Sequence, residues 1–290
     1  MVETKKLGDR LFILLVYALV TLVCTLCLYP MLHVLFASFS DPMRLSMHDG
    51  LMLWPDGYSL KGYRVILNNP NIWSGYRNTI YYVLLGTAIN MMMTTPGAFI
   101  LSRKGWPGRK FFMFLFVFTM YFSGGMIPTF LIVRALGLYN TTWALVLPGA
   151  IGTWNMIVLR TAFSSIPEAL PESAYLDGAN DLQILLYIFL PLSKATLAVI
   201  ILFYAVGHWN SWFPAMLYLR DSRRYPLQLI LRDILINNGS GGVVEDAEAQ
   251  YLKEIVKYST IIVATVPILC IYPFAQKYFM KGVMLGSVKG

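Results

Sequence analysis

The chain alternates long apolar runs with shorter polar stretches. Six runs contain no Asp, Glu, Lys or Arg, and they cover residues 11–39, 78–102, 111–133, 135–159, 195–219 and 258–276. Each is near or above the ~20 residues that a helix needs to cross the hydrocarbon core of a bilayer. None alternates in polarity as a transmembrane β-strand does, and backbone groups in lipid must bond within their own segment. The pattern predicts an all-α polytopic membrane protein with six transmembrane helices, as a single domain over residues 1–290.

The composition agrees with a lipid environment. Only 13% of the residues are charged and 57% are hydrophobic, whereas soluble domains carry about 25% charged residues. So few charges cannot cover a water-facing surface of this size. The net charge of +8 could indicate nucleic-acid binding, but the Lys and Arg residues lie between the apolar runs. We therefore expect a bilayer, and no nucleic acid, as the partner of these cations.

Basic residues near the ends of the runs predict the orientation. Lys5, Lys6 and Arg10 precede the first run, and four cations crowd into residues 103–110. Short loops rich in Lys and Arg stay in the cytoplasm, although the total counts of cations on the two sides hardly differ. With six spans, we expect both termini to be cytoplasmic.

The polar stretch between the fourth and fifth runs, residues 164–192, has the most informative pattern. It reads SSIPEALPESAYLDGANDLQILLYIFLPL. Glu168 and Glu172 sit early in helical segments, where carboxylates stabilise the positive end of the helix dipole. Gly178 permits either a sharp turn or the close approach of another backbone. The stretch predicts two short helices joined by a hinge at the membrane face, the second of them ending at Pro191.

The spacing in this stretch resembles the EAA loop of bacterial ATP-binding-cassette importers. That loop reads E-A-A, three residues, Gly, nine residues, then I-x-L-P. The same spacing occurs over residues 172–191, with Ser173 in place of an alanine. In the family the loop forms a coupling helix that docks onto the ATPase subunit. The resemblance implies that the ATPase-coupling residues are Glu172, Ser173, Ala174, Asp177, Gly178, Ile188, Leu190 and Pro191.

The C-terminal sequence QKYFMKGVMLGSVKG is similar to the tails of the sugar-importing subfamily, including the smaller permease of the maltose-transporter type. There the tail reaches between the ATPase subunits, which implies the same role here for Gly286, Val288, Lys289 and Gly290. A frayed basic tail is the alternative. The overall likeness is to permeases that import oligosaccharides released from plant or algal polysaccharides.

The chain has no G-x-x-x-x-G-K-[ST] phosphate loop. The resemblance therefore implies that ATP and Mg bind to separate ATPase subunits, that this chain binds no cofactor, and that it is not an enzyme. It also implies a second permease subunit in a heterodimer, an ATPase dimer and an extracytoplasmic solute-binding protein. The function that the resemblance implies is that of a permease subunit in an ATP-driven importer of sugars or oligosaccharides, and the implied location is a bacterial inner membrane.

Polar and aromatic side chains within the runs are candidates for the translocation path. Polar groups inside a membrane face the bundle interior or a wet cavity, and aromatic rings with amides can hold a sugar. Contacts between helices are the alternative role for such residues. The candidates are Asn90, Trp154, Asn155, Tyr204, Trp209 and Asn210.

Two other classes of function remain open on the sequence. A secondary transporter or channel for a small solute usually carries charged residues inside the membrane. The six runs have no Asp, Glu, Lys or Arg, and their only basic side chains are those of His33 and His208. An intramembrane enzyme would need a motif such as H-E-x-x-H or G-x-S-x-G, and neither occurs. No catalytic residues are therefore expected. The three cysteines, Cys24, Cys27 and Cys270, lack further metal ligands nearby and are expected to be free thiols buried in helices.

Overall fold

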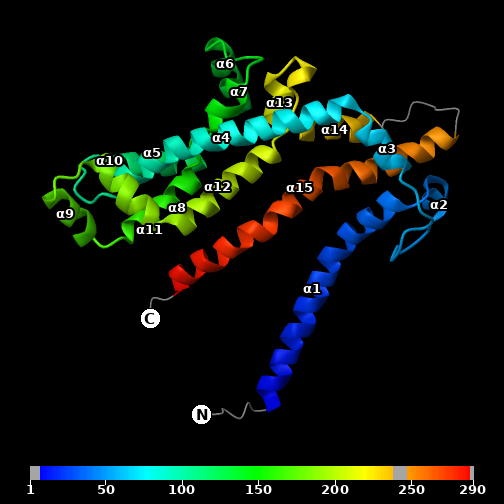
Figure 1. Cartoon of the computed structure of the whole chain (residues 1–290), viewed down its shortest axis with the longest axis horizontal. Coiled ribbons are helices and arrows are strands. Elements are labelled where there is room, and N and C mark those ends of the chain that lie inside the picture. The colour runs from blue at the N-terminus through cyan, green and yellow to red at the C-terminus, as the bar shows by residue number, and fades with distance from the viewer. Residues whose placement is uncertain (1–6, 238–246, 288–290) are drawn as a thin grey trace. The chain divides into compact units, whose positions relative to one another are not determined.

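The computed structural model describes residues 7–237 and 247–287 as helices joined by short connections (Figure 1). Within those ranges there is no β-strand, which confirms the all-α prediction. Contacts between Cα atoms divide the chain into two compact units, Met1–Pro70 with Asp233–Thr265 and Asn71–Arg232 with Val266–Gly290. A single domain over residues 1–290 remains a prediction.

The first unit is formed by α1 (Leu7–Phe39), α2 (Pro42–Met47), α3 (Lys61–Leu67) and the first part of α15 (Ala247–Ser287). Its small core joins Ala37, Leu45, Met52 and Ile255. Gly62 allows α3 to approach α15, because a Cβ there would collide with the Ser259 hydroxyl. The most apolar window of α1 has no buried residue, so this part of the helix presents its apolar surface to its surroundings, whereas the end near Ala37 packs in the core.

The second unit is organised around α4 (Pro70–Ser102), which contains the predicted span 78–102. Its largest core joins the end of α4 to α8, α12 and the segment between them, through side chains such as Phe99, Phe163 and Phe189. The remaining helices of this unit are α5 (Arg109–Tyr121), α6 (Met126–Ala135), α7 (Trp143–Val146), η1 (Leu147–Gly149), α8 (Thr153–Ser164), α9 (Ala169–Leu176), α10 (Asp181–Ile184), η2 (Leu185–Phe189), α11 (Leu190–Leu192), α12 (Lys194–Trp209), α13 (Phe213–Tyr218), η3 (Ser222–Arg224), the first part of α14 (Leu227–Asn237) and the part of α15 from Val266 onward.

Three of the predicted spans are not continuous helices. The run 111–133 divides into α5 and α6, which meet at 115°, where Gly125 has a φ of 87°. The run 135–159 divides at η1, which contains Pro148, and α8 follows at 49°. The run 195–219 divides after Trp209, and Pro214 lies in the first turn of α13. Proline and glycine weaken a helix at these points, so each run satisfies its backbone in two shorter helices.

The described residues contain three single helices long and apolar enough to cross a membrane, and up to six spans if each bent pair counts as one. The third bent pair joins Asp181–Leu192 to α12 at 87°. The predicted sixth span, residues 258–276, lies inside α15, which begins eleven residues earlier at Ala247. The prediction of buried thiols was wrong. All three cysteines are free and exposed, because α1 and residues 261–271 of α15 carry exposed apolar side chains.

Candidate functional site

The predicted coupling segment contains a short helix, α9, with one inward and one outward face. Pro171 is buried and Ala174 is half-buried against the main core of the second unit. Glu172 and Ser173 are exposed, and Leu176 is 90% exposed. Residues three or four apart lie on the same side of a helix, so Glu172 and Leu176 share the outward face. The helix thus offers a carboxylate and a leucine for contact with another molecule.

A defined turn ends α9. Asp177 is its C-terminal cap, and Gly178 follows with a φ of 82°. The N–H of Gly178 donates to the Tyr175 carbonyl at 3.0 Å, and the N–H of Ala179 donates to the Ala174 carbonyl at 2.9 Å. This pair of bonds is the Schellman motif, which favours glycine at the left-handed position. A Cβ at Gly178 would meet no atom within 4 Å, so of the two predicted roles the structure selects the sharp turn.

The second predicted helix begins directly after this turn. Asn180 caps α10 through a capping box, because its side chain accepts from the Gln183 N–H at 2.9 Å and the Gln183 side chain accepts from the Asn180 N–H at 2.9 Å. The helix then widens to a π-helical turn in η2 and continues through α11 to Leu192. It therefore passes Pro191 by one residue instead of ending there. Ile188 and Leu190 are half-buried against the core, and Pro191 is exposed.

The two residues that follow α4 hold both ends of α9. The Lys104 Nζ lies 3.0 Å from a carboxylate oxygen of Glu168, just before α9 begins. At the other end, the Arg103 guanidinium lies 5.5 Å from the centroid of the Tyr175 ring and 5.9 Å from that of Phe189. The exposed ion pair contributes little, whereas a cation over an aromatic face is typically worth about 0.5–1 kcal/mol or more. These contacts tie α9 to the end of α4.

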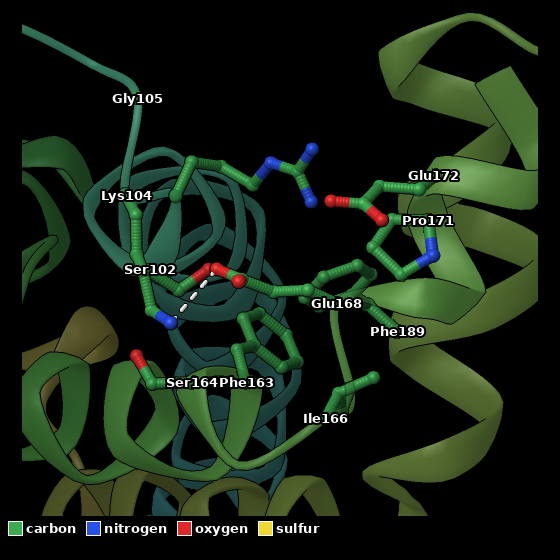
Figure 2. Close-up of a pocket in the computed structure, with 11 residues that line it drawn as sticks. Ser102, Lys104, Gly105, Phe163, Ser164, Ile166, Glu168, Pro171, Glu172 and Phe189 are labelled. Carbon is green, nitrogen blue, oxygen red and sulfur yellow. Dashed lines mark ion pairs between the residues drawn. The ribbon is translucent and has the colours of Figure 1, made fainter.

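A hollow of about 200 Å³ separates the end of α4 from α9. Figure 2 shows Lys104 paired with Glu168 on one side, and the Glu172 carboxylate directed into the hollow from the other. Ser102 and Ser164 add hydroxyl groups to its lining. Paired and free polar groups beside an exposed apolar side chain are typical of the rim of a protein interface. The arrangement is suited to docking and offers no catalytic geometry.

Tyr175 faces Asp181 across the Gly178 turn. Its hydroxyl donates to Asp181 Oδ1. This hydrogen bond, with a smaller effect of burial, raises the pKa of the Tyr175 phenol above its usual value. A tyrosine phenol is protonated at neutral pH even with its usual pKa, so the hydroxyl is available as the donor of this bond, which braces the turn.

Two predicted path residues meet at the break between η1 and α8. The fully buried Asn90 donates from Nδ2 to the carbonyl oxygens of Gly149 at 2.6 Å and Ala150 at 3.0 Å. Its Oδ1 lies 2.7 Å from His208 Nε2. The Tyr204 hydroxyl accepts from the Gly152 N–H at 2.9 Å and lies 2.7 Å from Thr94 Oγ1. Neighbouring side chains thus satisfy the backbone groups that the break leaves open.

The other predicted path residues do not join this group. Trp154 is 62% exposed, Asn155 is half-buried, and Trp209 is buried with its ring 6.3 Å from that of Tyr76. Asn210 is exposed at the C-terminal cap of α12. The contacts of Asn90 and Tyr204 are helix-to-helix contacts within the chain, and a role in the translocation path remains a prediction for all six residues.

Only part of the predicted C-terminal contact can be located. Gly286 lies in the last turn of α15. Val288, Lys289 and Gly290 lie outside the described residues. Their contact with an ATPase remains a prediction.

Comparison with known proteins identifies the family. Residues 72–285 match the family described as binding-protein-dependent transport system inner membrane component. The chain belongs to this family. The match contains α9, its turn and the helix that follows, so the segment that sequence analysis singled out lies within the part of the chain that the family shares.

Relatives extend over nearly the whole chain. The polygalacturonan/rhamnogalacturonan transport system permease protein YtcP of Bacillus subtilis (strain 168) is 43% identical over 97% of this chain and 99% of its own. Protein LplC of the same organism is 38% identical over 90% of this chain and 89% of its own. A crystal structure of a bacterial ABC transporter involved in the import of the acidic polysaccharide alginate contains a chain 33% identical, with a TM-score of 0.87, covering 94% of this chain and 98% of that one.

The family establishes the class of function. The chain is a membrane-embedded permease of an ATP-binding-cassette importer, and it is not an enzyme. Such permeases work in general with a partner permease, an ATPase and a binding protein. Membership in this family decides against the alternatives of a secondary transporter, a channel and an intramembrane enzyme.

Sequence analysis missed two residues of the coupling segment, Leu176 and Tyr175, and also Arg103, which contacts the segment from the end of α4. Leu176 is apolar, and an apolar residue in a short helix usually points inward. Leu176 lies four residues after Glu172 and directly before Asp177 and Gly178, which end the helix. This spacing could have indicated that Leu176 shares the outward face of α9 with Glu172. Arg103 was counted only as a charge that sets orientation, and Tyr175 was not singled out. Nothing local in the sequence shows that these two side chains meet, since four α-helices and the short helix η1 lie between them along the chain.

Proposed function

We propose that this chain forms half of the translocation path of an ATP-driven importer of oligosaccharides released from polysaccharides. Two relatives support the substrate class, since one is described by its transport of polygalacturonan and rhamnogalacturonan and the other by the import of alginate. The similarity to both extends over more than nine-tenths of the chain, so the likeness is not confined to the coupling segment.

The observation that carries the proposal is the outward face of α9. A helix of eight residues is too short to be stable by itself, yet α9 is held at both ends and closed by a Schellman turn. It nevertheless leaves Leu176 almost fully exposed. We infer that this face docks on a separate ATPase subunit, with Glu172, Ser173 and Leu176 in contact and with Ala174 and Gly178 positioning the helix.

The remaining assembly follows from that docking. We propose a heterodimer with a second permease, a pair of ATPase subunits that bind ATP and Mg, and an extracytoplasmic solute-binding protein. Because α9 must face the ATPase, its side of the membrane is the cytoplasm. The basic residues 103–110, next to α9, agree with the positive-inside rule, and both termini are then cytoplasmic.

The Gly178 turn provides a matched pair of variants. Gly178→Asn should leave recovery of the ATPase with the tagged chain within about twofold of wild type, since Asn tolerates the left-handed conformation. Gly178→Val should lower it roughly tenfold or more, since a β-branched residue is strained there although space around the glycine is open. Recovery is measured from native membranes in mild detergent, with ATP-dependent oligosaccharide uptake into proteoliposomes measured in parallel.

Three outcomes separate the parts of the proposal. Recovery of a second permease and an ATPase by wild type, with loss of the ATPase only in the Val variant, supports the coupling role of α9. Equal recovery by both variants would place the main ATPase contact elsewhere. Uptake of unrelated solutes in preference to oligosaccharides would contradict the substrate class while leaving the coupling intact.

A further inference from the structure

A second, larger cavity lies beside α9, at the end of the membrane-spanning part of α4. Its volume is about 620 Å³. It shares Arg103 and Gly105 with the lining of the hollow in Figure 2, and its other lining residues are different. We call it the α4–α10 slot. Its apolar wall includes Phe99, Ile100 and Leu182, and its polar wall is formed by Arg103, Tyr175 and Asp181. Ile100 is 44% exposed and Leu182 is 63% exposed, so the slot opens to the surroundings of the protein.

The slot lies where the chain changes from apolar to charged, as expected at the boundary between lipid acyl chains and headgroups. Its apolar wall belongs to the charge-free run that ends at Ser102, whereas Arg103 is the first charge beyond that run. Trp106 also lines the slot and stacks on Phe112 at 5.2 Å. Tryptophan is enriched at the membrane–water interface. An occupant would therefore have an apolar part along α4 and a polar part beside Arg103.

The polar wall presents one positive and one negative group, separated by one tyrosine ring. The Arg103 guanidinium lies 5.5 Å from the centroid of the Tyr175 ring, and the Tyr175 hydroxyl donates to Asp181 Oδ1. A guanidinium that lies over ring faces still has N–H donors along its edge, and these suit a phosphate. A carboxylate that accepts one bond through Oδ1 has further acceptor sites. The wall is thus complementary to a phosphate and an ammonium joined by a short link.

We propose that the α4–α10 slot binds a phosphatidylethanolamine molecule of the adjoining leaflet. Its phosphate meets Arg103, its ammonium meets Asp181, and the upper part of an acyl chain lies along Phe99 and Ile100. Phosphatidylcholine matches the charges but has no N–H to donate to Asp181, and phosphatidylglycerol lacks the cation. Because Arg103 and Tyr175 also hold α9, the bound lipid would steady the coupling helix. The binding itself does not depend on the proposed transport function.

The test labels the slot with a photo-crosslinking residue. The full chain, with the subunits that co-purify with it, carries p-benzoylphenylalanine at Leu182 and is reconstituted into nanodiscs of phosphatidylcholine, phosphatidylethanolamine and phosphatidylglycerol in equal amounts. Tyr187 is the control position, since it lies on the same helical stretch, is 76% exposed and does not line the slot. Mass spectrometry of the irradiated chain then measures the share of each lipid among the adducts.

We expect phosphatidylethanolamine to form a larger share of the adducts at position 182 than its share of the bilayer. Its adducts should outnumber those of each other lipid by about fivefold, which is the preference that roughly one hydrogen bond gives. At position 187 the shares should equal the composition of the bilayer. Asp181→Asn keeps an acceptor for Tyr175 and should remove the preference over phosphatidylcholine. Arg103→Gln should lower the phosphatidylethanolamine share at position 182 to its share of the bilayer, whereas Arg103→Lys should retain the preference.

Arg103→Gln could also loosen α9, so Asp181→Asn, which keeps the Tyr175 bond, provides the decisive comparison. A preference that persists unchanged in Asp181→Asn overturns the proposal, as does an equal share of the three lipids at position 182. Adducts at position 182 to a protein subunit, or to the chain's own tail, would also overturn it by assigning the slot to a protein segment. Preference for phosphatidylglycerol would show that Asp181 takes no part in binding, and would overturn the headgroup assignment.

Discussion

Replacing Leu176 with aspartate is expected to abolish recovery of the ATPase with this chain while leaving the chain folded in the membrane. Leu176 is 90% exposed on the outward face of α9, so the substitution removes no contact within the chain. Burying a leucine at an interface contributes about 1.5–3 kcal/mol, and a buried unpaired carboxylate costs several more. Together these correspond to a loss of affinity of roughly a hundredfold or more. The measurement is co-purification of the ATPase, together with ATP-driven uptake.

The controls separate docking from solubility. Leu136→Asp makes the same change at another exposed leucine, at the C-terminal cap of α6, and should leave ATPase recovery unchanged. Leu176→Met keeps an apolar side chain of similar volume and should retain most of the affinity. Normal recovery with Leu176→Asp would show that α9 does not dock through this residue, and would shift the contact to Glu172 and Ser173.

The second large effect is expected at the break between η1 and α8. Asn90→Leu removes three hydrogen bonds and leaves the carbonyl groups of Gly149 and Ala150 without their donor. Hydrogen bonds of this kind contribute about 0.5–1.5 kcal/mol each, with measured averages near 0.6 within membranes. We expect the free energy of unfolding to fall by about 2–4 kcal/mol, measured by denaturation of the purified chain in detergent. Uptake should fall with the amount of folded protein.

Asn155→Leu is the matched control. It is the same substitution at a half-buried asparagine two residues into α8, and it should lower stability by less than about 1 kcal/mol. If Asn90→Leu reduced uptake while the free energy of unfolding stayed at the wild-type value, Asn90 would act on the transported molecule and not on the helix break. The same comparison would then favour a path role for Tyr204, which contacts the other side of that break.

The sequence by itself determined the features that depend on local rules. Length and lack of charge in the apolar runs predicted a helical membrane protein, because lipid admits backbone groups only in such structures. The spacing from Glu172 to Pro191 located the coupling segment. Its turn at Gly178 was among the predicted alternatives, because a helix end with glycine beyond Asp177 follows from backbone sterics. Each of these features involves residues within a few turns of one another.

Tertiary structure decided what those rules leave open. Pro148 and Gly125 permit a break in a helix, but the angles of 49° and 115° depend on what packs on each side. The amide of Asn90 could donate to a sugar or to the backbone, and only the tertiary structure shows that it donates to the carbonyl of Gly149, 59 residues away. Leu176 and Ala174 are both small or apolar residues of one short helix, yet one faces out and the other faces the core. The sequence could not separate these outcomes, because each depends on contacts between segments far apart along the chain.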